Sequence, residues 1–367
     1  MISIVTGIII LLALVALVVL SSRLPKLRHL KWPLIALCLL LLYNLIFKPS
    51  FFNISITDNN YLYGSLIDIL NHGSKVVILS IGMTLVIATG GIDISVGSVM
   101  AISGAIAASI IIVPPETLGG TTTRFIIAIN LALAVAACAG TWNGFLTAGC
   151  GIQPMVATLV LMVAGRGIAQ LITDGTIITY DDPLLNFIGN GHFLTLPFTT
   201  WIATCMFIMA LLLTRKTALG LFIESVGNNE KASKYAGIEA RTIKWMTYVI
   251  SGFCAGLAGL MVSSNIKCAD ANHAGLYLEL DAILATVIGG TSMAGGRFYL
   301  TGSLVGAVLI QTVATMMYAN DVNPAIVAVP KAIIVIIVCL LQSEVFRGKL
   351  SAFFTKFSGK ASKGDVA

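Results

Sequence analysis

Charge is scarce in this sequence. Only 10% of the 367 residues are charged and 57% are hydrophobic, whereas soluble domains carry roughly a quarter charged residues. The chain is therefore expected to be a polytopic membrane protein and not a soluble enzyme with a single anchor. The net charge of +6 is concentrated in a few segments that flank apolar runs, so it indicates membrane topology and not nucleic-acid binding.

Patterns typical of catalytic and metal sites are also lacking. Seven cysteines and four histidines are present, but they form no C-x-x-C or H-E-x-x-H spacing, which argues against a zinc site and a disulfide framework. There is no G-x-x-x-x-G-K-[ST] loop, so the chain is not expected to hydrolyse ATP itself. No nucleophile elbow occurs either. No catalytic residue, metal site or cofactor is therefore predicted for this chain.

What is abundant is apolar sequence. The chain is predicted to be an all-α polytopic membrane protein with about ten core transmembrane helices and an extra N-terminal one. The apolar runs are 2–20, 34–47, 76–89, 95–113, 125–148, 155–173, 196–213, 246–264, 282–291, 300–318 and 325–341. Several are shorter than the roughly 20 residues needed to cross a bilayer, so broken or re-entrant helices are expected.

Three regions follow from these runs. They are a hydrophobic segment with a basic loop at 1–31, a transmembrane domain at 32–342 and a basic cytoplasmic tail at 343–367. The first run lacks a basic start and a cleavage site, so it is interpreted as retained and not as a signal peptide. If it spans, eleven spans place the N-terminus outside and the C-terminus in the cytoplasm. If it only lies on the membrane, both ends are cytoplasmic.

The distribution of Lys and Arg sets the predicted orientation. Most of these residues fall in 21–31, 214–245, 292–298 and 343–367, and basic loops stay in the cytoplasm. Segment 214–245 is the longest polar interruption. Within it, 224–237 (ESVGNNEKASKYAG) is predicted to be one short helix that ends at Gly237, with Val226, Ala232 and Ala236 on a small-residue face. Docking of a soluble partner and a solvated connector both remain open for this segment.

Polar residues inside the apolar runs are the candidates for a translocation path. The stretch 88–104 (ATGGIDISVGSVMAISG) breaks a helix at Gly90 and Gly91 and brings Asp93 to the start of the next one. Because a charge at the bilayer centre costs ~2.5–3.5 kcal/mol, Asp93 must cap a helix, be paired or face a wet cavity. A structural cap and a broken helix beside a polar path both remain open. Further candidates are Ser95, Gly97, Asn143, Arg166 and Gln170.

Segment 267–298 joins an acidic loop, predicted to be external, to a short apolar run interrupted by glycines. Four residues, Asp270, Asn272, Glu279 and Asp281, are candidates for docking an extracellular partner. The alternative is a solvated loop followed by a re-entrant hairpin. Arg166 is expected either to pair with an external acid or to line the path, and Lys331 is expected to snorkel to the membrane interface.

Five stretches resemble one protein family. TLVIATGGIDISVGSVMAISGA, TLVLMVAGRGIAQLITDG, LGLFIESVGNNEKASKYAGI, YVISGFCAGLAGLM and ELDAILATVIGGTSMAGGRF are similar to the membrane subunits of bacterial ABC importers for monosaccharides, the ribose, xylose and galactose type permeases. The similarity runs in order from about 68 to 342. Within the family, RKTALGLFIESVG and ADANHAGLYLELDAILATVIGG most resemble the permease of galactofuranose importers. Galactofuranose, or a related pentose or hexose, is the substrate that this implies.

The resemblance also implies partners. Segment 224–237 would be the coupling helix, seated in a cleft of a cytoplasmic ATPase that binds ATP and Mg²⁺. A second permease chain, identical or paralogous, would complete the path, and a periplasmic sugar-binding protein would dock outside. The protein would be surrounded by lipid in the bacterial inner membrane. The residues implied in coupling are Glu224, Ser225, Val226, Gly227, Asn228, Asn229, Glu230, Lys231, Ala232, Ala236 and Gly237.

The sequence departs from the family pattern in two places. The apolar run at 1–22 exceeds what the family leads us to expect, and Ser225 stands where the relatives usually have Ala.

One alternative function is an ABC permease for another small solute, such as a nucleoside or an autoinducer. The other is an ion-coupled transporter, which would need paired acids or histidines in the spans. The apparent scarcity of such groups fits an uncharged sugar.

Overall fold

Helices make up most of the structure, which is a computed structural model that describes residues 2–56, 61–323 and 326–342. The predicted tail at 343–367 lies outside these residues. In the described part, strands occur as three short antiparallel pairs: β1 (Ser55–Ile56) with β2 (Leu62–Tyr63), β3 (Ile178–Thr179) with β6 (Cys268–Ala269), and β4 (His192–Phe193) with β5 (Leu196–Pro197). The predicted all-α class is confirmed.

Among the described residues, eleven helices overlap the eleven predicted apolar runs. They are α1 (Ile2–Arg23), α2 (Lys31–Phe47), α3 (Ser65–Ala88), α4 (Val96–Ile111), α5 (Thr121–Gly144), α6 (Pro154–Ile172), α8 (Phe198–Lys216), α11 (Ala240–Ile266), α12 (Leu278–Ile288), α13 (Leu300–Ala319) and α14 (Ala328–Gln342). Three short helices lie between them: α7 (Pro183–Asn190), α9 (Leu219–Asn228) and α10 (Glu230–Tyr235).

Not all of these helices are long enough to cross a bilayer. Seven helices in the described part of the chain have the length and composition of a membrane span, and α1 is the most apolar of them. Three shorter apolar helices correspond to α2, α4 and α14. Helix α12 has 11 residues and therefore a length of roughly 16 Å, about half of a bilayer core. The expectation of short or broken membrane helices is met most clearly by α12.

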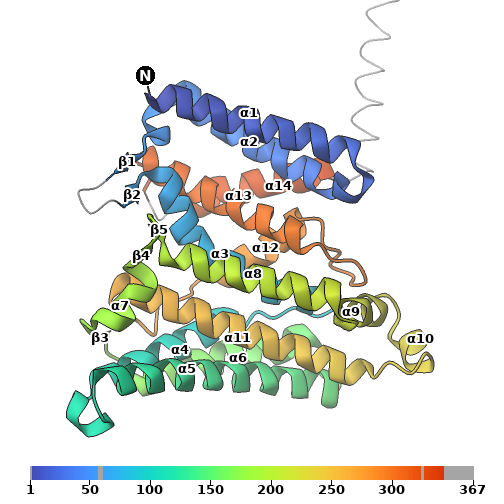
Figure 1. Ribbon diagram of the computed structural model, residues 1–367. Coiled ribbons are helices and arrows are strands. Elements are labelled where there is room, and N and C mark those ends of the chain that lie inside the picture. The colour runs from blue at the N-terminus through green and yellow to red at the C-terminus, as the bar shows by residue number, and fades with distance from the viewer. Residues whose placement is uncertain (1, 57–60, 324–325, 343–367) are drawn as a thin grey trace, which may run out of the picture.

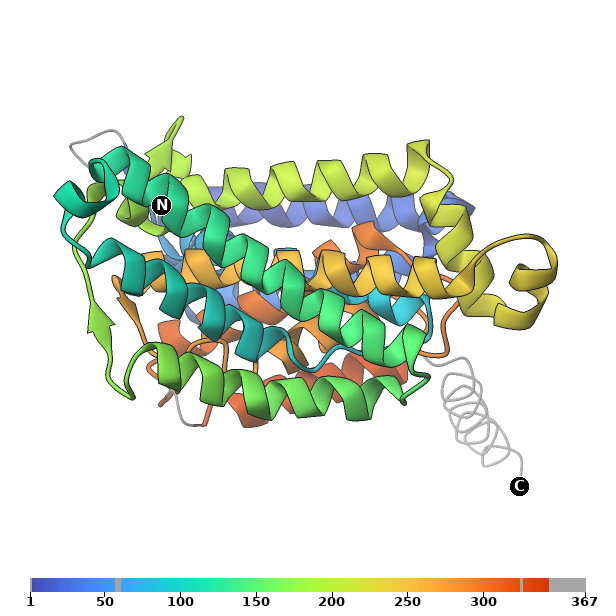
Figure 2. The ribbon, with the colours of Figure 1, turned by 90° about the horizontal axis from the view of Figure 1, so that it is seen from below.

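The long helices lie side by side, with the strands and α7 at one end of the molecule and α9 and α10 at the other (Figure 1). Helices α3 and α13 are the most buried of the spans, at 78% and 67% of their apolar windows, followed by α11 at 61%, whereas only 6% of that of α1 is buried. Helices α1 and α2 pack against each other along one side, and α2 in turn contacts α13 and α14 (Figures 1 and 2). Helix α1 therefore lies outside the central packing.

The two ends of the molecule group the loops as the charge pattern predicts. At the end with α9 and α10, His29 of the 21–31 segment stacks on Tyr299 with ring centroids 3.9 Å apart, and Gly296 meets the end of α3. At the opposite end, Leu62 donates its amide to the carbonyl of Thr195 at 3.1 Å. Segments 21–31, 214–245 and 292–298 thus share one end of the molecule.

Helix α3 begins at Ser65 and not near residue 76, so the predicted boundary is wrong. The first three turns carry Asp68, Asn71, His72 and Lys75, which lower the hydropathy and suggested a loop. These polar side chains are compatible with a helix here because Asn71 accepts a hydrogen bond from Thr199 at 2.7 Å, and the other three line a cavity. Tertiary surroundings, and not local composition, decide this boundary.

Close packing of α5 on α11 depends on glycine. A Cβ atom at Gly140 would lie 2.3 Å from the carbonyl oxygen of Tyr248, and one at Gly252 would lie 2.5 Å from that of Ala136. Small residues allow such approach where lipid provides no hydrophobic force between helices. This contact brings the middle of α11 next to α5 and so positions the polar residues described below.

Candidate functional site

The segment predicted as one coupling helix consists of two helices. Helix α9 ends at Asn228 and α10 begins at Glu230, because Asn229 adopts an extended conformation (φ −158°, ψ 103°). The side chain of Asn229 accepts a hydrogen bond from the amide of Ala232 at 3.0 Å and so caps α10. The prediction of one helix over 224–237 is wrong because an N-cap residue interrupts it. Gly237 follows α10 with a left-handed φ of +83°, as expected of a helix C-terminus.

The exposed face of this segment also differs from the prediction. Val226 is buried at 2% exposure against the core, whereas Ala232 on α10 and Ala236 directly after it are exposed. These residues therefore do not share one face, because the break at Asn229 turns the chain. Tyr235 is 93% exposed and was missed by the sequence analysis. An aromatic residue in a polar loop was the available signal, since large exposed aromatics are unusual outside interfaces.

Helix α9 touches the break between α3 and α4 through backbone contacts. A Cβ atom at Gly227 would lie 1.8 Å from the carbonyl oxygen of Ala88 and 2.5 Å from the amide of Gly296. The amide of Gly296 donates to the same Ala88 oxygen at 2.9 Å. Gly90 follows with φ +80° and Gly295 with φ +86°. Three segments thus meet without side chains between them: α9, the α3–α4 turn and the α12–α13 loop.

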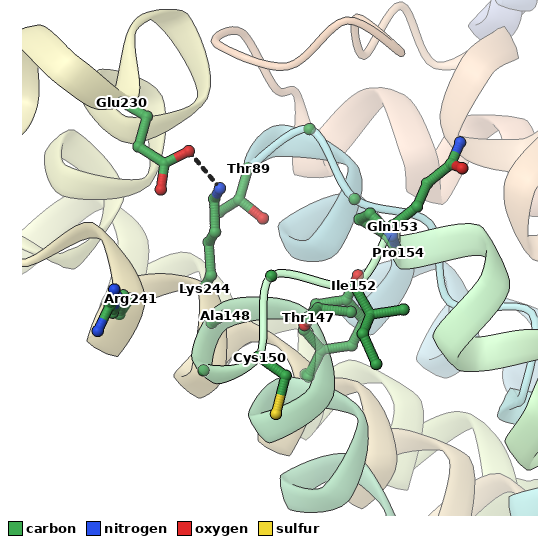
Figure 3. A pocket seen from close by; sticks show the side chains of 15 residues that line it. Thr89, Thr147, Ala148, Cys150, Ile152, Gln153, Pro154, Glu230, Arg241 and Lys244 are labelled. Carbon is green, nitrogen blue, oxygen red and sulfur yellow. Dashed lines mark hydrogen bonds and ion pairs between the residues drawn. The ribbon is translucent and has the colours of Figure 1, made fainter.

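A cavity of about 420 Å³ adjoins this contact (Figure 3). The predicted path residues Gly90 and Gly91 line one side, and the connection between α5 and α6 lines another. Glu230 of α10 and Lys244 of α11 enclose it, and their ion pair measures 2.6 Å between Oε2 and Nζ. The coupling segment and the α3–α4 turn therefore share one cavity at this end of the molecule.

Asp93 is buried at 1% exposure and is held by hydrogen bonds. Its Oδ1 accepts from the amide and hydroxyl of Ser95 at 3.1 and 2.6 Å and from Asn143 at 3.4 Å. Its Oδ2 accepts from the hydroxyl of Ser251 at 2.7 Å. Asn143 also donates to the Ser95 hydroxyl at 2.8 Å. This network connects α4, α5 and α11 and supports the structural interpretation, because Asp93, Ser95 and Asn143 lie inside the packing in this structure.

The other predicted path residues lie nearer the opposite end. Gly97 of α4 packs on Gly275, since a Cβ there would lie 2.6 Å from the Gly275 carbonyl oxygen. Arg166 of α6 donates to the carbonyl oxygens of Ala271 and Ala274 at 3.0 and 2.6 Å. Arg166 therefore binds the backbone of the 271–274 loop. Among the described residues no acid lies within ion-pair distance of it, although Glu279 and Asp270 attract it electrostatically. Gln170, one turn later, donates to the side chain of Asn272.

Two of the four predicted docking residues are not at the surface. Glu279 and Asp281 lie on α12 at 4% and 9% exposure, so the prediction that they belong to an external loop is wrong. Asn272 is exposed, and Asp270 is partly exposed. Burial opposes ionisation of Asp270, but hydrogen bonds from His273 and from two backbone amides outweigh it and lower the pKa of Asp270 below its ordinary value. Only Asp270 and Asn272 remain available to a partner in this structure.

The expectation that Lys331 snorkels is also wrong. Its Nζ lies 3.0 and 2.8 Å from the two carboxylate oxygens of Asp281, because α14 lies beside α12. Together with the ion pair of Arg124 and Asp182 at 2.7 Å, this contact shows that charged groups inside the molecule are more numerous than the sequence suggested. Most of these charges are paired across helices that are distant in sequence.

Comparison with known proteins gives consistent matches. A family model described as the permease component of a branched-chain amino acid transport system matches residues 65–339. The chain is 50% identical to the galactofuranose transporter permease protein YtfT of Escherichia coli K12, over 88% of this chain and 93% of that protein. It is 40% identical to the fructose import permease FruF of Bifidobacterium longum, over 86% and 88%. It is 34% identical to the ribose import permease RbsC of E. coli K12, over 85% and 92%. No solved structure matches significantly.

Proposed function

The chain belongs to the permease family of branched-chain amino acid type transport systems, and from this membership we propose that it is the membrane subunit of an ATP-binding-cassette importer for a monosaccharide. The relatives named above are permeases for galactofuranose, fructose and ribose. The proposed substrate is galactofuranose or a related pentose or hexose. The proposed location is the bacterial inner membrane, with the C-terminus in the cytoplasm.

Beside the family membership, the structural observation that supports this proposal is the contact of α9 with the α3–α4 turn. Gly227 lies against the carbonyl of Ala88, and Gly296 donates to the same atom. Because backbone meets backbone, a displacement of α9 by a cytoplasmic partner moves the α3–α4 turn and the α12–α13 loop with little slack. Such a connection is what a transporter needs if a separate ATPase opens and closes its path.

The proposed partners follow from the two ends of the molecule. A cytoplasmic ATPase, which binds ATP and Mg²⁺, would contact α9 and α10, with Tyr235 as the central side chain. A periplasmic sugar-binding protein would dock at the opposite end, near Asp270 and Asn272. A second permease chain, identical or paralogous, would complete the path. The path is proposed to pass the α3–α4 turn at Gly90 and Gly91, where the inner cavity lies.

Purification of the tagged chain from native membranes in mild detergent tests this proposal. The expected result is recovery of an ATPase subunit and a second permease, followed by sugar uptake into proteoliposomes that requires ATP and a binding protein. The opposite result is a chain that purifies alone and transports without ATP. That outcome would favour an ion-coupled transporter and would make Asp93 the first coupling candidate to test.

A further inference from the structure

A second and larger cavity lies at the external end of the molecule. Its volume is about 870 Å³, and its walls come from the first turns of α3, α12 and α14 and the last turns of α13. Cavities that bind small ligands are typically of roughly 300–1,000 Å³. The cavity is separate from the inner one beside Gly90, since the two share no lining residue.

Four charged side chains from three helices line this cavity: Asp68 and Lys75 of α3, Asp281 of α12 and Lys331 of α14. Lys331 of α14 pairs with Asp281 of α12, with its Nζ 2.8 Å from Oδ2. Lys75 of α3 also lines the cavity, where burial opposes its charged form and the attraction of Asp281 favours it. In the described part of the chain Lys75 has no hydrogen bond or ion pair within bonding distance. The Nζ group of Lys75 therefore has no hydrogen-bond partner among the described residues.

These charges show whether the cavity wall contacts lipid, water or protein. Ionisable side chains at membrane depth are costly in lipid and are found beside protein or water, where they mark transport routes. Asp281 is only 9% exposed, and it lines the cavity together with its partner Lys331 and the neighbouring Lys75. The wall made by α3, α12 and α14 is thus hydrated or covered by protein, and it is not a lipid-facing surface.

The chemistry of the lining fits an uncharged, hydroxyl-rich molecule. Two acids, Asp68 and Asp281, balance two bases, Lys75 and Lys331, so the lining has no net charge when all four are ionised. Carboxylates accept hydrogen bonds, ammonium groups donate them, and Gln311 does both. Tyr277 and Tyr318, at 65% and 52% exposure, add aromatic surface. Sugar hydroxyls both donate and accept, so they can use every one of these groups.

We propose that this cavity is the site at which the chain receives the transported sugar from the external side, with Lys75 and the Asp281–Lys331 pair bonding to its hydroxyls. This inference rests on the proposed function and adds the residues that contact the substrate. None of the residues predicted from the sequence to line the path belongs to this set. Asp281 had been assigned to docking, and Lys331 to the membrane interface.

The test uses the complete transporter in proteoliposomes, with uptake and ATP hydrolysis measured in the same preparation. One variant is Lys75→Gln, and the second combines Asp281→Asn with Lys331→Gln, so that no buried charge is left alone. Uptake is expected to fall about tenfold or more in each, as for the loss of one or two hydrogen bonds to charged groups. Hydrolysis stimulated by the loaded binding protein is expected to stay within about twofold, because the coupling segment is unchanged.

A matched control is the surface pair of Lys48 and Asp321, which is 3.7 Å apart at the same end and lies outside the cavity. The double variant Lys48→Gln with Asp321→Asn should import sugar at the wild-type rate. If both cavity variants import at the wild-type rate, the assignment of the cavity is wrong. If the wild-type complex itself imports no sugar, the proposed function fails instead, so the two failures are distinguishable.

A labelling experiment tests whether the sugar enters the cavity without measuring transport. In Gln311→Cys, a membrane-impermeant thiol reagent should modify position 311, and the sugar with its binding protein should slow that reaction several-fold. Native Cys268, a free thiol beside the external loop, serves as the internal control in peptide mass spectra. A cysteine at 311 that reacts equally fast with and without sugar, or that does not react, would overturn the proposal.

Discussion

Gly227 of α9 lies directly against the carbonyl oxygen of Ala88, the last residue of α3. A Cβ atom on Gly227 would come within 1.8 Å of that oxygen, and the oxygen already accepts the amide of Gly296 at 2.9 Å. The contact thus leaves no room for a side chain. It connects the segment proposed to meet the ATPase to the turn that separates α3 from α4.

Gly227→Ala should therefore weaken coupling. The added methyl group must push α9 away from α3, at a cost of about 1–3 kcal/mol, while α8 and α11 still insert normally. We expect sugar uptake to fall at least about tenfold with unchanged amounts of protein in the membrane. Gly167→Ala is the matched control, because a Cβ there meets nothing within 4 Å. Equal uptake by the two variants would show that the Ala88 contact does not transmit motion.

Tyr235→Ala should reduce binding of the ATPase. Tyr235 is 93% exposed on α10, and exposed tyrosines that become buried in an interface often contribute about 2 kcal/mol or more. The expected effect is a roughly thirtyfold weaker affinity for the purified ATPase, measured as binding of the ATPase to the immobilised permease in detergent. Tyr63→Ala, a tyrosine 65% exposed at the opposite end, should bind as wild type does. Loss of affinity in Tyr63→Ala as well would point to a global defect.

Local sequence was enough to locate the membrane helices but not their ends. Apolar runs identified eleven helices because burial in lipid or in the protein selects the same residues. The start of α3 was misplaced because Asp68, His72 and Lys75 lower the hydropathy of its first turns, although they face a cavity that three other helices form. A hydropathy value describes single residues and not their surroundings. Polar residues of a helix that face a cavity are therefore mistaken for a segment outside the helix.

The site residues were harder to predict because their partners are distant in sequence. Asp281 was assigned to an external loop, yet it pairs with Lys331, 50 positions later. The sequence left Asp93 open as either a path residue or a cap, and the distinction came from Ser251 of α11, 158 positions away. By contrast, Gly90, Gly91 and Gly237 were assigned correctly to helix ends, because left-handed or irregular backbone is encoded locally.

Replacement of Asp93 should destabilise the protein in a graded way. Asp93→Asn keeps one oxygen for the amide and hydroxyl of Ser95, and the hydroxyl of Ser251 can rotate to accept from the new amide. Asp93→Ala leaves the buried amide and hydroxyl of Ser95 and the buried hydroxyl of Ser251 without their acceptor, at about 1–3 kcal/mol each. Thermal unfolding in detergent should therefore show a larger loss for Ala than for Asn. If Asp93→Ala melts like the wild type, the network does not hold α4, α5 and α11 together.

The end of the molecule that carries α7 offers a comparison between two neighbouring acids. Asp182 is 2% exposed and forms a 2.7 Å ion pair with Arg124, and its Oδ1 accepts the amides of Leu184 and Leu185 at the start of α7. Asp181 pairs with Lys267 at 3.3 Å, but its side chain is 84% exposed. The two residues thus form the same kind of ion pair, one buried in the protein and one exposed to water.

Asp182→Asn should destabilise the protein by about 3 kcal/mol, because it leaves the buried charge of Arg124 unpaired. The amide oxygen of the new side chain still caps α7, so the loss reports on the ion pair. Asp181→Asn should cost less than about 1 kcal/mol, since surface ion pairs are screened by water. Combining Asp182→Asn with Arg124→Met removes the lone charge and should recover part of the stability, which a double-mutant cycle in thermal unfolding would detect. Equal losses for Asp181→Asn and Asp182→Asn would mean that burial of the Arg124 pair adds nothing to the attachment of α7 to α5.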